Sequence, residues 1–235
     1  MNPVIKVESD VVGSAVGFSG PVLDGLKGFH WIGDNSSKTA KDFSEVGVGV
    51  INGAPSYSAG YATFGPAGGL DLDMIDTASM TMAVAFRGES TWADKPVVVG
   101  ARTVNVPMNL VYISNLDKLI YRIYDAANSL VGVTTSPAFS GNTNWNMLFA
   151  SVDDVAGQIR LYIPAQSINL TASYTGPRKI IESKINAGKD GAAAFVGQIK
   201  QAHAAVWSRA LSVGEMDEHY EYVQAKLSAL ASIDV

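Results

Sequence analysis

The fold is decided by the stretch Ala205-Val206-Trp207-Ser208-Arg209-Ala210-Leu211-Ser212-Val213-Gly214-Glu215, which joins the last predicted strand to a long predicted helix. Ser212 and Glu215 have the S-x-x-E spacing of a capping box, in which each residue satisfies a free amide at the start of a helix. Apolar residues then recur at alternating spacings of three and four, which places them on one helical stripe. The stripe consists of Val213, Met216, Tyr220, Val223, Leu227 and Leu230.

The chain before this stretch has the alternating apolar pattern of β-strands, most clearly in residues 80–87. Two hairpins are predicted, residues 109–114 with 118–125 and residues 145–152 with 158–163. Further strands are expected at residues 95–102, 129–135 and 192–207. Many short strands between frequent turn signals are typical of an all-β, two-sheet antiparallel jelly-roll sandwich.

The chain of 235 residues fits one domain of this kind. Residues 1–27 are expected to form an N-terminal arm or short strands, residues 28–211 the jelly-roll sandwich, and residues 212–235 a C-terminal amphipathic helix. Charged residues make up 17% of the chain, below the usual quarter, and this low share suits broad buried sheet faces.

Composition excludes several classes of function. A net charge of −5 without a basic stripe argues against nucleic acid as a partner. The absence of cysteine excludes disulfides, thiolate metal sites and a cysteine nucleophile. No apolar run is long enough to be inserted in a membrane, and no signal-peptide core is visible. We therefore expect a chain that is made and folded in a cytoplasm.

The stretch from Ala205 to Glu215 resembles the closing motif of laminin-G-like, concanavalin-A-like jelly-roll domains, where an R-A-L-S turn joins the last core strand to a helix. Residues 145–163 are similar to the central hairpin of that family, and residues 30–64 to its opening stretch. The resemblance implies a sandwich fold that is used mainly for binding. The family's usual acidic pair is replaced here by Lys200-Gln201.

Some concanavalin-A-like folds are glycoside hydrolases, whose chemistry needs two carboxylates flanking the scissile bond. The predicted strands do not place such a pair on one face. The acids of residues 215–221 fall on the helix, where steps of about 100° separate them. Asp71, Asp73 and Asp76 are interpreted as exposed edge acids, with cation binding as the alternative. We expect no enzyme activity.

The sequence offers two candidate residues for a metal site. The resemblance implies Ca²⁺ at a rim of the sandwich, where Asp42 matches a family position and Asp153 lies in a predicted turn. The alternative is that Asp42 caps a turn. His30, His203 and His219 lack the paired spacing of a zinc site, and His30 is interpreted as a packed residue.

Sugar binding would use aromatic faces in turn-rich segments together with fixed polar groups. Trp92 beside Asp94 is the first candidate, followed by Tyr57 and Tyr61. The alternative is that these aromatics pack under their own loops. The other three tryptophans are assigned to the core: Trp31, Trp145 and Trp207.

Together these patterns favour a non-catalytic structural or attachment module of a virion, such as a capsid decoration, tail-fibre or receptor-binding protein of a phage. A glycan-binding, lectin-like domain is the second hypothesis, and a polysaccharide-cleaving enzyme the third. The expected partners are other virion proteins or a cell-surface glycan.

The helix stripe packs either on the chain's own sandwich or on a second copy in a homo-oligomer. The expected location is the virion, after synthesis in a host cytoplasm. The alternatives are the cytoplasm, or the extracellular space reached by a route that uses no signal peptide.

Overall fold

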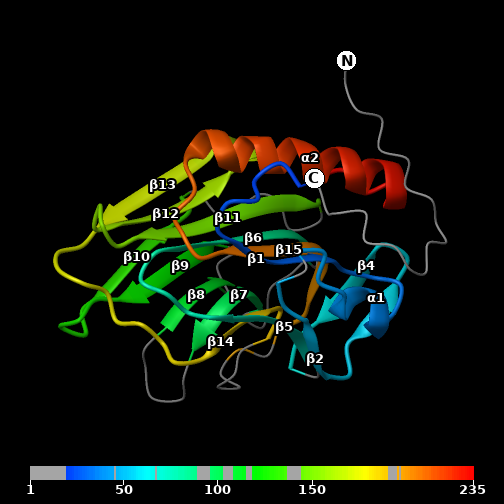
Figure 1. Cartoon of the computed structure of the whole chain (residues 1–235), viewed down its shortest axis with the longest axis horizontal. Helices are drawn as coiled ribbons and strands as arrows, with labels where there is room; N and C mark the ends of the chain where they lie inside the picture. Colours follow the sequence, from blue (N-terminus) through cyan, green and yellow to red (C-terminus); the bar gives the residue numbers. More distant parts are fainter. Residues whose placement is uncertain are drawn as a thin grey trace.

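The computed structural model describes residues 20–44, 46–66, 68–88, 96–102, 108–114, 118–136, 144–189, 195 and 197–235. These residues form an all-β sandwich of two antiparallel sheets with a C-terminal helix, as predicted (Figure 1). Within the described ranges, no helix combines the length and the apolar character needed to cross a membrane.

Sheet A is built around the strand that ends in Trp207. Its members, in spatial order, are β13 (Ile168–Ser173), β12 (Gln158–Ile163), β11 (Asn146–Asp153), β6 (Met80–Arg87), β15 (Ile199–Trp207), β4 (Tyr61–Phe64) and β3 (Ser56–Ser58). A further strand, β1 (Leu26–Trp31), pairs with β15 as well. Because β1 and β4 pair with different halves of β15, they share one of its edges.

Sheet B forms the other layer. Its members, in spatial order, are β10 (Leu130–Thr134), β9 (Leu119–Tyr124), β8 (Met108–Ile113), β7 (Val97–Arg102), β14 (Lys184–Ala187), β5 (Gly68–Ile75) and β2 (Val50–Gly53). The remaining elements are two short helices and one long helix: α1 (Ser36–Ala40), the 3₁₀ turn η1 (Pro164–Gln166) and α2 (Val213–Ala231).

The main core lies between the two sheets. It is filled by alternate residues of each strand, such as Met82, Val84 and Phe86 of β6, which are fully buried. The predicted hairpins are both present as β8–β9 and β11–β12. Residues 31–77 were expected to form short strands and loops, and β2 to β5 lie there, although their individual bounds were not predicted. The strands β13 and β14 were not predicted.

The outer face of sheet A carries a second buried layer, which α2 covers (Figure 1). The outward residues of β6 beneath the helix are the small Ala83 and Ala85, which leave room for the helix to approach. Trp207 is fully buried in this layer and donates from its indole N–H to the Val22 carbonyl at 3.0 Å. The core position predicted for Trp207 is therefore between sheet and helix.

The predicted capping box holds the start of α2. The Ser212 hydroxyl accepts from the Glu215 backbone N–H, and the Glu215 carboxylate accepts from the Ser212 N–H at 2.8 Å. Arg209 donates to both carboxylate oxygens of Glu215 and, from Nε, to the Asp24 carbonyl at 2.9 Å. The Arg209 guanidinium lowers the pKa of Glu215 to about 2. This turn therefore fixes where the helix leaves the sheet.

Two histidines meet across the second layer. His203 Nε2 lies 3.1 Å from His219 Nε2, and His203 Nδ1 lies 2.9 Å from the carbonyl oxygen of His30. Because a carbonyl can only accept, this geometry assigns a proton to His203 Nδ1, so that His203 Nε2 accepts from His219. Phe29 and Trp207 pack their rings against the pair. Burial lowers the pKa of His219 to about 3 and that of His203 well below its usual value.

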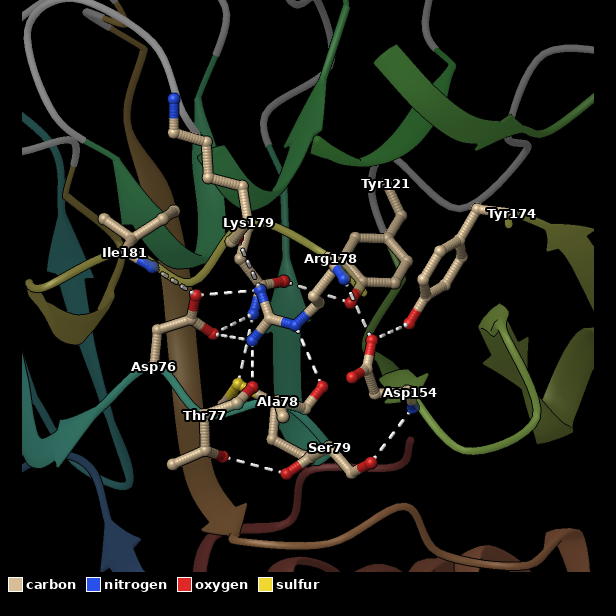
Figure 2. A network of polar contacts seen from close by, with 12 residues as sticks. Asp76, Thr77, Ala78, Ser79, Tyr121, Asp154, Tyr174, Arg178, Lys179 and Ile181 are labelled. Atoms are coloured by element: carbon tan, nitrogen blue, oxygen red, sulfur yellow. Dashed lines mark hydrogen bonds and ion pairs between the residues drawn. The ribbon is translucent and has the colours of Figure 1, made fainter. Parts of the chain in front are cut away.

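A buried ion pair closes one end of the sandwich (Figure 2). The guanidinium of Arg178 donates to both carboxylate oxygens of Asp76 and to the carbonyls of Thr77 and Ala78. Asn109 of β8 donates to the same carboxylate at 2.7 Å. Asp76, interpreted from sequence as an exposed edge acid, is therefore a buried anchor that ties the β5–β6 connection to the chain after β13.

We expect Arg178→Met to lower the free energy of unfolding by about 3–5 kcal/mol, because it leaves the Asp76 carboxylate buried without its cation. Denaturant unfolding measures this loss. Lys184→Met is the matched control: its side chain is 45% exposed beside Asp73, and a loss within about 1 kcal/mol is expected. Equal losses in the two variants would show that the Asp76–Arg178 pair is not an anchor.

We expect the folded state to lose stability as the pH falls below about 6.5. The unfolded chain takes up a proton at His219 near the ordinary histidine pKa of 6.5, whereas the folded chain does so only near about 3. Neutral His219 therefore makes its full contribution to the free energy of unfolding above pH 6.5. This contribution is lost as the pH falls from 6.5 towards 3, by about 2 kcal/mol between pH 7 and pH 5. Urea unfolding at both pH values measures it. His219→Leu is expected to reduce the difference, and an unchanged difference would exclude this histidine as its source.

Candidate functional site

A polar groove of about 760 Å³ opens where β6 ends and β11 begins, beneath α2 and the residues that follow it. The sheet side of the groove contributes Arg87, the last residue of β6, and Asn144 and Trp145, which precede β11. The helix side contributes Tyr220 and Gln224, one turn apart on α2. The remaining lining residues are Ala165 of η1 and Ser232, Asp234 and Val235 of the C-terminal tail.

The tail after α2 forms one wall of this groove. Ser232 has a left-handed conformation (φ 52°) that turns the chain back, and the Ile233 N–H donates to the Leu227 carbonyl at 3.2 Å. The carbonyl of Val235 accepts from Tyr220 Oη and from Gln224 Nε2, both at 2.9 Å. Ile233 and Val235 are buried on either side of Asp234, which is exposed.

The aromatic face in the groove is supported from behind. Trp145 is half-buried and packs edge-to-face on Tyr61, with ring centroids 5.7 Å apart. Tyr61 follows Gly60, where a Cβ would lie 2.3 Å from the Cβ of Ala231 at the end of α2. The turn before β4 therefore fits against the helix only with glycine, and this contact fixes the position of the tryptophan ring.

The groove contains a cation and an anion. Arg87 Nε is buried and has no hydrogen-bond partner in the described part of the chain. Asp234 is exposed and accepts no hydrogen bond from the residues that the structure describes. Charged groups of this kind, next to a fixed aromatic ring, are what a polar ligand requires.

Only part of this site was predicted from the sequence. Tyr61, one of the candidates, lies directly behind Trp145, whereas Trp145 itself was assigned to the core. Arg87, Asn144 and Asp234 were not singled out. One local signal was present, a tryptophan next to asparagine after the turn-rich residues 137–143, but the convergence with the tail depends on the fold.

Tyr57, another of the predicted ligand-binding residues, does not join this groove. Tyr57 pairs with Ala62 across β3 and β4 and faces the main core, so it lies on the opposite face of sheet A from Tyr61. Burial raises the pKa of the Tyr57 hydroxyl, which has no hydrogen-bond partner within the described ranges. Trp92 and Asp94 lie outside the described residues, and their role stays a prediction.

The acids predicted for calcium are used in turns. Asp42 Oδ1 accepts from the backbone N–H of Phe29 and Ser44, and its Oδ2 accepts from the Ser44 hydroxyl and the Gly47 N–H, at 2.8–3.0 Å. Asp153 Oδ1 accepts two backbone N–H groups of its own turn. These contacts correspond to the turn-capping alternative for Asp42. The described residues contain no group of three or more potential metal ligands.

Acids considered for hydrolysis are also held by protein partners. Asp73 and Asp71 both lie near Lys184 Nζ, at 2.8 and 3.7 Å. On α2, Asp217 accepts from the Tyr162 hydroxyl at 2.5 Å. Burial and, second to it, this hydrogen bond raise the pKa of Tyr162 to about 12. Asp71 and Asp73 lie on β5 and Asp217 lies on α2, and none of the three lines the groove.

The helix stripe packs on the chain's own sheet. Met216, Val223 and Leu227 are buried in the second layer, and Tyr220 packs at its edge. Leu230 is 63% exposed. Val213 is half-buried at the first turn. Most of the stripe therefore follows the self-packing alternative, and the oligomeric state stays a prediction.

Solved structures with a similar fold include the binding domains of two other proteins. The binding domain of botulinum neurotoxin DC in complex with SialylT has a TM-score of 0.64 and 13% identity, over 86% of this chain and 52% of that chain. The binding domain of Paraclostridial Mosquitocidal Protein 1 has a TM-score of 0.63 and 16% identity, over 87% and 53%.

A third similar structure is of botulinum neurotoxin type C, whose cell entry is dependent upon interaction with two ganglioside molecules. It has a TM-score of 0.64 and 11% identity, over 86% of this chain and 52% of that chain. No protein-family model and no curated protein matches the sequence. At such low identity the likeness shows a shared β-sandwich fold, and this chain spans about half the length of the structures it matches.

Proposed function

We propose that this chain is a non-catalytic glycan-binding module, which attaches the protein or particle that carries it to carbohydrate. The observation that carries the proposal is the groove over Trp145, where a supported aromatic ring lies beside Arg87, Asn144 and Asp234. A sugar ring offers an apolar face of C–H groups for the tryptophan and a rim of hydroxyls for the polar side chains.

The structural neighbours support a binding role over a catalytic one. Two of those described above are binding domains, one of them in complex with SialylT. The third is of a neurotoxin whose cell entry depends on two ganglioside molecules. A glycan is therefore the favoured ligand class. A virion location, as part of a decoration, tail-fibre or receptor-binding protein, stays a prediction that is compatible with an attachment role.

Glycan binding is tested with the full chain on an array of immobilised glycans, followed by calorimetric titration of the best binder. We expect Trp145→Ala to weaken binding at least about tenfold, which corresponds to about 1.4 kcal/mol, because the stacking surface is lost. Trp145→Phe keeps an aromatic face and is expected to retain part of the affinity. Thermal unfolding of each variant shows whether the fold is preserved.

Trp92→Ala is the matched comparison, since it removes the tryptophan that the sequence placed first. Loss of binding in Trp92→Ala with full binding in Trp145→Ala would move the site away from the groove. Absence of binding to every glycan at millimolar concentration would contradict the proposed function itself.

A further inference from the structure

The groove is electrically balanced among its lining side chains. Arg87 is its cation and Asp234 is its anion, while the other lining side chains are uncharged. The carbonyl of Val235 is occupied by Tyr220 and Gln224, so it adds no free acceptor of its own. Among the side chains, a ligand in this groove therefore meets one strong donor, Arg87, and one strong acceptor, Asp234.

These two groups match the hydrogen-bonding capacity of sugar hydroxyls. A guanidinium only donates and an ionised carboxylate only accepts, whereas a hydroxyl does both. One hydroxyl can accept from the Arg87 guanidinium and another can donate to Asp234, since both side chains line the groove. Two hydroxyls of one sugar ring meet both requirements without adding charge.

A carboxylated or sulfated sugar fits this groove less well. It would gain from Arg87, but Asp234, which lines the same groove, presents a like charge to it. Like charges brought together at an interface repel strongly and select against the wrong partner. The net charge of −5 on the whole chain adds to this disadvantage at low salt.

We infer that the groove over Trp145 binds an uncharged sugar residue, and that Asp234 is the residue that rejects anionic sugars. This inference rests on the proposed function and assigns its ligand class. Trp145 supplies the stacking surface, Arg87 the donor, and Asp234 both an acceptor for neutral hydroxyls and a repulsive charge.

The test compares matched pairs of probes by calorimetry or saturation-transfer NMR: methyl glucoside against methyl glucuronide, and methyl galactoside against methyl galacturonide. We expect the unmodified protein to bind at least one neutral member about tenfold or more tightly than its acidic counterpart. Asp234→Asn is expected to reduce this ratio to within about threefold, because the amide keeps the size of the side chain and removes its charge.

Two further variants separate the effect of the Asp234 charge from the effects of other charged side chains. Glu182→Gln removes an exposed charge that does not line the groove and is expected to leave the ratio unchanged. Arg87→Gln is expected to weaken the neutral sugar. Tighter binding of the acidic probes, or an unchanged ratio in Asp234→Asn, would overturn the inference while glycan binding stands. No binding of any probe or glycan would instead overturn the proposed function.

Discussion

Sheet A has to be covered by apolar surface on both faces, and this requirement determines the arrangement of the rest of the chain. Its inner face packs on sheet B through large side chains, and its outer face packs under α2 through small ones such as Ala83 and Ala85. Arg209 and the capping box set where the helix starts, and the returning tail sets where it ends. The groove lies where that tail passes the end of β6.

Much of the fold could be predicted from local sequence. Alternating patterns predicted β6 and the two hairpins, and the spacing of Ser212 and Glu215 predicted the start of α2. These features depend on neighbours within a few residues. The Asp76–Arg178 pair joins residues 102 positions apart, and nothing in the sequence near either residue indicates that both are buried. For that reason Asp76 was wrongly interpreted as an exposed acid.

The groove could not be predicted for a similar reason. Its walls come from the end of β6, the middle of α2, the residues just before β11 and the tail, which converge only after both sheets have formed. A tryptophan at the start of a strand is normally part of a core, and the packing of Trp145 on Tyr61 agrees with that in part. Sequence also could not separate Tyr57 from Tyr61, whose side chains lie on opposite faces of one sheet.

The inward turn of the tail affects how this domain can be joined to anything else. Val235 is buried, and its carbonyl oxygen is held by two side chains of α2, so any polypeptide fused after it leaves the sandwich at the rim of the groove. A tag or fusion partner attached there would compete with a ligand for space.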